Sequence, residues 1–193
     1  MIYPDNFEQK IGFNEIRTML RERCLSTLGK EQVDKMAFSD DAETVNEWLK
    51  QVREFRRLIL EVEDFPLQYF YDVRESIVRI RIENTHLEEN ELFDLRRSLS
   101  TIEGIVKILN HSDEDESHAE ENDGWRREKK YTYPALHELA KDIVTFPQII
   151  QRIDQILDKY GKIRDNATPE LLQIRRELAK TESSISRTLY SIL

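Results

Sequence analysis

Two histidines stand in the one stretch of the sequence whose residue types suit a metal ion. His111 and His118 lie among seven carboxylates, which are Asp113, Glu114, Asp115, Glu116, Glu120, Glu121 and Asp123. Imidazole and carboxylate groups bind divalent cations only when their spacing fixes a geometry. A stretch without apolar periodicity fixes none, so we interpret it as a solvated linker. His86 and His137 have no Cys or His nearby at ligand spacing, and we assign no metal site.

Gly29 and Lys30 form the only pair that resembles part of a phosphate-binding loop. Such a loop needs an upstream glycine, and a Ser or Thr after the lysine to bind magnesium. Here Glu31 follows the lysine, and the five glycines are scattered at positions 12, 29, 104, 124 and 161. The sequence therefore predicts no nucleotide site and no bound cofactor in this chain.

Cys24 is the single cysteine and the remaining candidate nucleophile. It falls on the apolar face of a predicted helix, where a free cysteine usually acts as a small buried hydrophobic residue. No catalytic triad is evident. We assign no catalytic, cofactor-binding or metal-binding residues, and expect that the chain is not an enzyme.

The charge distribution bears on nucleic-acid binding. The net charge is −9, of which residues 111–123 contribute −7, so the remaining sequence is nearly neutral. Basic residues occur in two groups, Arg53, Arg56 and Arg57, and Arg126, Arg127, Lys129 and Lys130. Because acidic residues are interspersed, we interpret both groups as solvated surfaces and expect weak or no DNA binding by this chain alone.

Composition indicates the fold class. Hydrophobic residues make up 39% and charged residues 35% of 193 residues, with only five Gly and five Pro, a balance typical of amphipathic helices. We predict an all-α protein with a multi-helix core bundle. No apolar run approaches the roughly 20 residues that cross a bilayer, and no export signal follows Met1, so we expect a cytoplasmic protein without membrane contact.

Apolar spacing places the helices in two helical parts. Residues 1–110 form an N-terminal helical core, residues 111–132 an acidic mobile loop, and residues 133–193 a continuation of the core. The expected helices begin at Asn14, at Asp40 or Asp41, at Asp72, near Glu88, and near residues 135, 148 and 168. Gly29 is expected to interrupt a helix, and residues 162–165 to form a turn or small strand.

The last helix repeats apolar residues at coiled-coil spacing, with Leu171, Leu178 and Ile185 seven residues apart. We expect Leu171, Ile174 and Leu178 to pack on the core, and Ile185, Leu189 and Ile192 to project from it. No capping sequence precedes Leu193, so we predict a long C-terminal helix that is truncated and that self-associates loosely through its exposed seam.

Three stretches of the chain resemble the second bacterial MutS paralogue, a member of the mismatch repair family. The first runs from Ile11 to Ile16 and continues at Ser26–Glu31. The second comprises Glu54–Leu58, Asp64–Leu67 and Asp72–Arg74. The third and most specific comprises Gly161–Leu171 and Ile174–Glu177. The similarity spans the chain apart from residues 111–123.

The resemblance implies that this chain is the core of a longer protein and the start of its lever helix, which leads to a clamp around DNA. The parent is then a dimeric ATPase that uses ATP and Mg, with an optional C-terminal nuclease domain. It suppresses recombination or rescues stalled ribosomes, so DNA and the ribosome are its expected partners. The family's mismatch-reading Phe-x-Glu wedge is missing, since Phe70-Tyr71-Asp72 is not a substitute.

A second hypothesis does not depend on the resemblance. The charge of residues 111–123 suits an acidic helical protein-interaction module that binds a basic partner. The sequence downstream of Leu193 distinguishes the two hypotheses, because only the first requires a phosphate-binding loop there.

Overall fold

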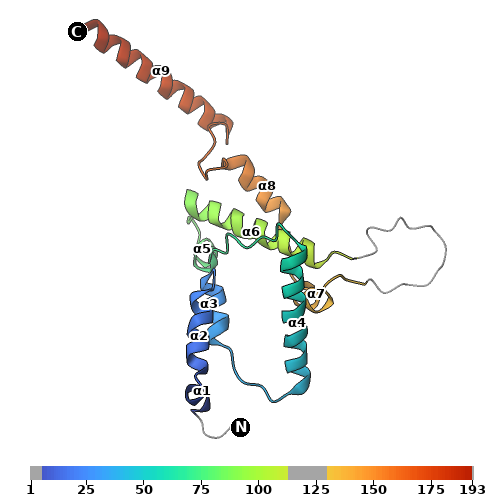
Figure 1. Cartoon of the computed structure of the whole chain (residues 1–193). Helices are drawn as coiled ribbons and strands as arrows, with labels where there is room; N and C mark the ends of the chain where they lie inside the picture. The colour runs from blue at the N-terminus through green and yellow to red at the C-terminus, as the bar shows by residue number, and fades with distance from the viewer. Residues whose placement is uncertain (1–5, 113–129, 193) are drawn as a thin grey trace, which may run out of the picture. The chain divides into compact units, whose positions relative to one another are not determined.

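The computed structural model describes residues 6–112 and 130–192, and within these ranges the fold is all-α, as predicted (Figure 1). Apart from helices, the described residues contain two isolated antiparallel bridges, between Ser112 and Tyr131 and between Leu157 and Ile163. Most of the predicted acidic loop, residues 113–129, lies outside the described residues. The bridge between Ser112 and Tyr131 pairs its two flanks.

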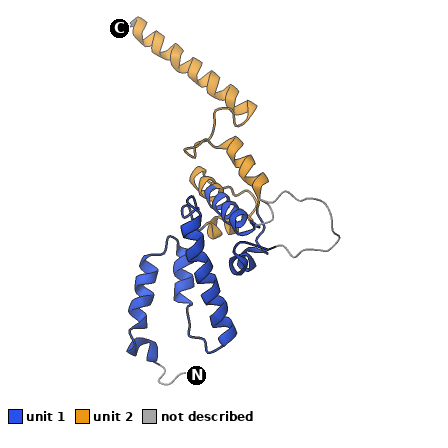
Figure 2. Ribbon diagram, turned by 45° about the vertical axis from the view of Figure 1, so that its right-hand side comes forward, with its two compact units in different colours: residues 1–72, 97–145 blue, residues 73–96, 146–193 orange. Residues whose placement is uncertain are grey.

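The chain divides into two compact units that are discontinuous in sequence (Figure 2). Residues 1–72 and 97–145 form unit 1, and residues 73–96 and 146–193 form unit 2. Helix α6 (Glu89–Leu109) contributes residues to both units. The unit boundaries therefore differ from the linear boundaries predicted at residues 110 and 132.

Unit 1 contains α1 (Phe7–Lys10), α2 (Phe13–Glu22), α3 (Thr27–Asp34), α4 (Ala42–Glu61) and α7 (Pro134–Ala140). Helix α2 packs on α1 and α3, and α4 packs on α7. The main cluster of buried side chains joins α4, α6 and α7, and consists of Leu58, Leu109, Tyr133, Leu136 and Ala140. Apolar packing of α7 against α4 and α6 thus forms the main core of unit 1.

Unit 2 contains α5 (Arg74–Arg79), α8 (Pro147–Ile156) and α9 (Pro169–Ile192), with the N-terminal part of α6. Ile150 and Ile153 are the buried residues of α8, and Leu157 is buried directly after it. Helices α8 and α9 both begin with a proline. Proline suits the first turn of a helix, because N–H groups in that turn have no acceptor within the helix and no hydrogen bond is lost.

Several predicted helix ends are wrong. Helix α2 begins after Gly12, whose φ of 74° is left-handed, whereas the Asn14 side chain accepts a hydrogen bond from Arg17. Gly29 lies inside α3 and donates its N–H to the Ser26 hydroxyl, which caps that helix. The predicted cap Asp72 instead accepts a hydrogen bond from Thr27, and α5 begins after Val73. The first two differences have local causes, the left-handed Gly12 and the Ser26 cap, whereas Asp72 is engaged by a residue 45 positions away.

Other predictions are confirmed. Asp41 caps α4 by accepting the N–H of Thr44 at 2.9 Å, and Thr168 caps α9 by accepting the N–H of Leu171 at 3.1 Å. Helix α8 ends at Ile156, because Leu157 adopts an extended conformation. Leu157 then bridges to Ile163, so the predicted small strand over 162–165 corresponds to a single bridge.

Candidate functional site

The residues considered for chemistry are not brought together by the fold. The described part of the chain contains no group of three or more His, Cys, Asp or Glu side chains suited to a metal, and His118 lies outside it. Cys24 is half-buried rather than buried, and its thiol donates to the Leu20 carbonyl. His137 contacts Asn110 and stacks on Tyr131. A candidate site of another kind, built from polar contacts, lies where α9 begins.

We define the α9 root as residues 158–168, which join α8 to α9, together with the α6 and α8 side chains that hold them. Its first part is a tight turn. The Asp158 carboxylate accepts the N–H groups of Tyr160 at 2.8 Å and Lys162 at 2.9 Å, and the Asp158 N–H donates to the Lys162 carbonyl at 2.8 Å. The backbone hydrogen bond from Lys162 lowers the pKa of Asp158.

Gly161 is buried at the end of this turn with a φ of +81°. L-residues rarely adopt this conformation. A Cβ atom at this position would also lie 2.6 Å from Cδ1 of Phe93 on α6. The turn therefore requires glycine for two independent reasons, its backbone angle and its close approach to an aromatic ring.

Two ion pairs tie this region to α6. Lys162 Nζ lies 2.9 Å from Glu89 Oε2, and the hydrogen bond from Lys162 is the main cause of the lowered pKa of Glu89. Arg96 donates to both carboxylate oxygens of Asp154 on α8, at 2.8 and 3.2 Å. This two-point contact raises the pKa of Arg96 and fixes the relative orientation of two planar groups.

The second part of the root leads into α9. Arg164 Nε donates to the backbone carbonyls of Asp154 at 3.0 Å and Leu157 at 2.8 Å, which are orphan acceptors at the end of α8. Arg175 pairs with Asp165 one turn and a half into α9. Together with the Thr168 cap, these contacts define how α9 leaves α8.

Beyond the root, α9 has little packing. Leu171 and Leu172 are half-buried, and every residue from Gln173 to Ser191 is exposed. Ile174 is 61% and Leu178 58% exposed, so the prediction that these two residues pack on the core is wrong. The predicted exposure of Ile185 and Leu189 is confirmed. The anchoring of α9 therefore comes from polar contacts at its root rather than from its apolar seam.

Glu89, Phe93 and Arg96 were not identified from the sequence as parts of a site. They follow one another along one side of α6, more than 50 residues before the segments they hold. No local pattern distinguishes them from ordinary helix residues. The signal that was available is the Gly161–Leu171 stretch, whose glycine, cap and proline mark a defined connection.

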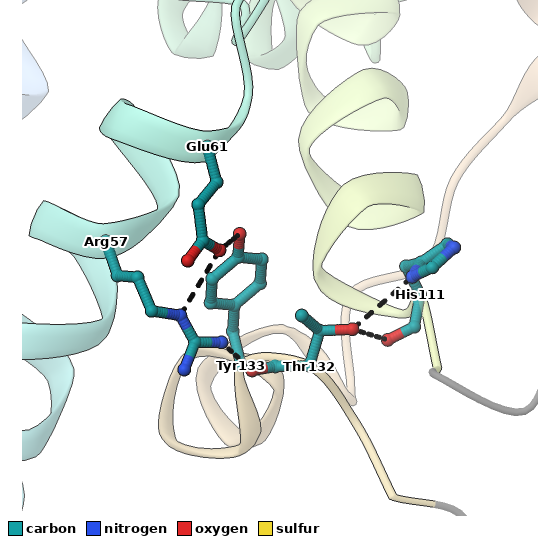
Figure 3. Close-up of polar contacts among 5 residues, drawn as sticks. All are labelled: Arg57, Glu61, His111, Thr132 and Tyr133. Carbon is teal, nitrogen blue, oxygen red and sulfur yellow. Dashed lines mark hydrogen bonds and ion pairs between the residues drawn. The ribbon is translucent and has the colours of Figure 1, made fainter.

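A second set of polar contacts lies in unit 1 and joins α4 to residues 111, 132 and 133 (Figure 3). Glu61 accepts hydrogen bonds from the Tyr133 hydroxyl at 2.7 Å and Arg57 Nε at 3.2 Å, and Arg57 also donates to the Thr132 carbonyl. Burial, followed by the hydrogen bond to Glu61, raises the pKa of Tyr133. Thr132 in turn contacts His111. These contacts hold both flanks of the acidic segment close to α4.

The basic residues do not form a clear nucleic-acid surface. Arg53, Arg56 and Arg57 are exposed on α4, and Arg57 is paired with Glu61. Arg126, Arg127 and Lys129 lie outside the described residues, and Lys130 is exposed. No helix within the described ranges is long and apolar enough to span a membrane.

Comparison with known proteins gives a consistent family. No family model matches the chain. This chain is 26% identical over 183 residues to a protein named Endonuclease MutS2 from Alkaliphilus oremlandii. It is 28% identical over 183 residues to a protein of the same name from a Geobacillus species. A third protein of this name, from Levilactobacillus brevis, is 28% identical to this chain over 177 residues. These matches cover 92–95% of this chain but only 21% of each relative, so the chain spans about a fifth of their length. The resemblance to the second bacterial MutS paralogue is thereby confirmed, and over nearly its whole length this chain is homologous to the bacterial MutS2 proteins.

Proposed function

We propose that this chain is a non-catalytic core-and-lever part of a MutS-like DNA-binding ATPase. In this proposal α9 is the beginning of the lever, and the α9 root passes nucleotide-driven movement from the core to a distant clamp on nucleic acid. The observation that carries the proposal is the construction of the root. Polar contacts from α6 and α8 fix the start of a helix that is otherwise exposed along its length.

The chemistry of the parent is assigned to residues outside this chain. Nucleotide binding needs a glycine-rich loop with Lys and Ser or Thr, and the Gly29-Lys30-Glu31 sequence in α3 does not fit ATP or Mg. We therefore propose that ATP, Mg and any nuclease activity belong to other parts of a cytoplasmic homodimer. Suppression of homologous recombination and rescue of stalled ribosomes are its proposed roles, with DNA and the ribosome as partners.

The reading frame beyond Leu193 tests this proposal. We expect a helix that continues the seam of α9, followed later by a Gly-x-x-x-x-Gly-Lys-Ser/Thr loop. A stop codon directly after Leu193, or an unrelated domain, would contradict the proposal.

An acidic helical interaction module is the second candidate. It is favoured by the charge of −7 over residues 111–123 and by the contacts of Arg57, Thr132 and His111, which hold the flanks of this segment. In that case a basic protein partner should lose affinity when the seven carboxylates are changed to amides. Unchanged affinity would exclude this candidate.

A further inference from the structure

The α9 root changes character between Arg164 and Thr168. Up to Arg164 the chain is tied to the end of α8. The Arg164 N–H donates to the Ile156 carbonyl at 2.8 Å, and Arg164 Nε donates to the Leu157 carbonyl at 2.8 Å. Backbone atoms at the end of a helix do not move independently of that helix. Arg164 therefore marks the end of the part of the root that is fixed to α8.

Thr168, in contrast, already belongs to α9. Its hydroxyl accepts the N–H of Leu171 at 3.1 Å, and its carbonyl accepts the N–H of Leu172 at 3.1 Å. Pro169 follows as the first residue of the helix, and it has no N–H with which to bond back into the root. Thr168 and the helix therefore move as one body.

Asn166 and Ala167 connect these two bodies, and we call them the pivot. Among the described residues, a single backbone hydrogen bond holds this short segment, from the Ala167 N–H to the Arg164 carbonyl at 3.1 Å. Asn166 is exposed, and no residue in the described part of the chain forms a hydrogen bond with it. The backbone dihedral angles of the pivot are thus the ones that can change without breaking the contacts of α8 or of α9.

The ion pair between Arg175 and Asp165 spans the pivot. Asp165 directly follows the fixed Arg164, whereas Arg175 lies on α9. The pKa of Glu89 on α6 is lowered first by the hydrogen bond from Lys162 and, to a smaller extent, by the nearby charge of Arg175. Arg175 is 43% and Asp165 73% exposed, and exposed pairs are weak and sensitive to salt. The pair therefore restrains α9 without locking it.

The apolar contacts of α9 lie close to the pivot. Leu171 and Leu172, its half-buried residues, are in the first turn of the helix. With a rise of about 1.5 Å per residue, a rotation of about 10° moves Leu171 by less than about 1 Å, but it moves the far end of the 24-residue helix by roughly 6 Å. A small change at the pivot is thus amplified along α9 while these apolar contacts persist.

We propose that the pivot is the hinge of α9, and that the Arg175–Asp165 pair is a latch that holds the helix in the described orientation. Breaking the pair releases α9 to rotate, while the contacts from α6 and α8 keep the rest of the root in place. An exposed ion pair shifts such an equilibrium by at most about fivefold, so the latch opens readily. The proposal rests on the proposed function only in treating α9 as a lever.

Spin-label distances, measured by double electron–electron resonance in the 193-residue chain with Cys24→Ser, test the proposal. Samples are diluted with unlabelled protein, so that only distances within one molecule contribute. The label sites are introduced in three pairs, one across the pivot, one between α6 and α8 and one within α9: Gln151→Cys with Arg187→Cys, Asn90→Cys with Gln151→Cys, and Gln173→Cys with Arg187→Cys. Arg175→Ala should broaden the first distance distribution by about 5 Å, the displacement of that site in a rotation of about 10°, and leave the other two unchanged.

Arg176→Ala is the matched control, because Arg176 is the next residue along α9 and forms no ion pair within the described ranges. It should leave all three distributions unchanged. The reversed pair, Asp165→Arg with Arg175→Asp, should restore the distribution that Arg175→Asp alone broadens. High salt should act on the unchanged protein as Arg175→Ala does.

An unchanged distance across the pivot in Arg175→Ala would overturn the proposal. Broadening within α9, or between α6 and α8, would also contradict it, because the helix or the whole root would then yield instead of the pivot. The measurement needs neither nucleotide nor nucleic acid, so its result is independent of the proposed function. A stop codon after Leu193 would remove the lever role and leave the pivot intact. Circular dichroism verifies that each variant remains folded.

Discussion

Gly161 is the residue on which the geometry of the α9 root depends most directly. Gly161→Ala imposes a left-handed conformation on an L-residue and places Cβ 2.6 Å from the Phe93 ring. We expect a loss of about 2–4 kcal/mol in the free energy of unfolding, from backbone strain and overpacking together. Chemical denaturation of the two proteins measures this difference. A loss below about 1 kcal/mol would contradict the described turn.

Gly104→Ala is the matched control for this substitution. Gly104 lies inside α6, and a Cβ there would meet only Cγ of Pro66, at an ordinary 3.5 Å. Since alanine is the better helix former, the control should gain about 1 kcal/mol. Glycine to alanine should thus lower the free energy of unfolding at position 161 and raise it at position 104. A general sensitivity to added methyl groups would not produce opposite effects.

Acid should weaken unit 2 through Glu89. Its pKa is lowered in the folded state, first by the hydrogen bond from Lys162, relative to an ordinary value of 4.5. A depressed carboxyl pKa stabilises the fold above the unfolded value, and this contribution is lost as pH falls through the folded pKa. Glu89→Gln should therefore reduce the loss of stability below about pH 4.5, measured by thermal unfolding across pH. Glu182→Gln, on the exposed part of α9, serves as the control; equal effects of both changes would count against this role of Glu89.

At the scale of elements, α9 should exchange its amide hydrogens unevenly. Only Leu171 and Leu172 are partly covered, and beyond the pair of Arg175 with Asp165 no described contact joins α9 to another element. Because most of the stability of helices in proteins comes from tertiary packing, protection in dilute protein should be confined to the first turns and fall rapidly beyond Arg175. Hydrogen exchange with mass spectrometry measures this. Strong, uniform protection up to Ile192 in a proven monomer would refute the exposed-lever interpretation.

The elements also separate what the sequence can predict from what it cannot. The helices of α4, α6 and α9 were predictable, because their long apolar repeats and the Asp41 and Thr168 caps are local signals. Helix α3 was misread because the Ser26 cap makes Gly29 tolerable inside it. The packing of Ile174 was misjudged because a heptad pattern identifies an apolar face without specifying whether a partner is present.

The candidate site could be predicted only in part. The Gly161–Thr168 connection is recognisable from its glycine, cap and proline. Its supports, Glu89, Phe93 and Arg96, reach it across a long sequence separation, and such contacts have no periodic signature. Tertiary geometry is therefore required to identify them.

At the scale of the whole molecule, the 193-residue chain alone should hydrolyse no ATP and bind DNA weakly and without sequence preference. Its sequence contains no phosphate-binding loop, and its net charge of −9 opposes the counterion release that drives DNA binding. A contaminant-free preparation that turned over ATP with Mg would contradict the first expectation. Tight binding in a gel-shift assay at physiological salt would contradict the second.

The most direct test of the central claim measures coupling through the α9 root in the protein made from the full reading frame. The quantity is the ratio of DNA dissociation rates with and without ATP, for the unchanged protein, Gly161→Ala and Gly104→Ala. We expect this ratio to be of the order of ten in the unchanged protein and in Gly104→Ala, and to fall towards one in Gly161→Ala. Basal ATP hydrolysis should remain unchanged within about twofold in both variants. Arg175→Ala, which breaks the pair with Asp165, should give an intermediate loss. Full coupling in a folded Gly161→Ala protein would contradict the claim that this root transmits movement to the lever.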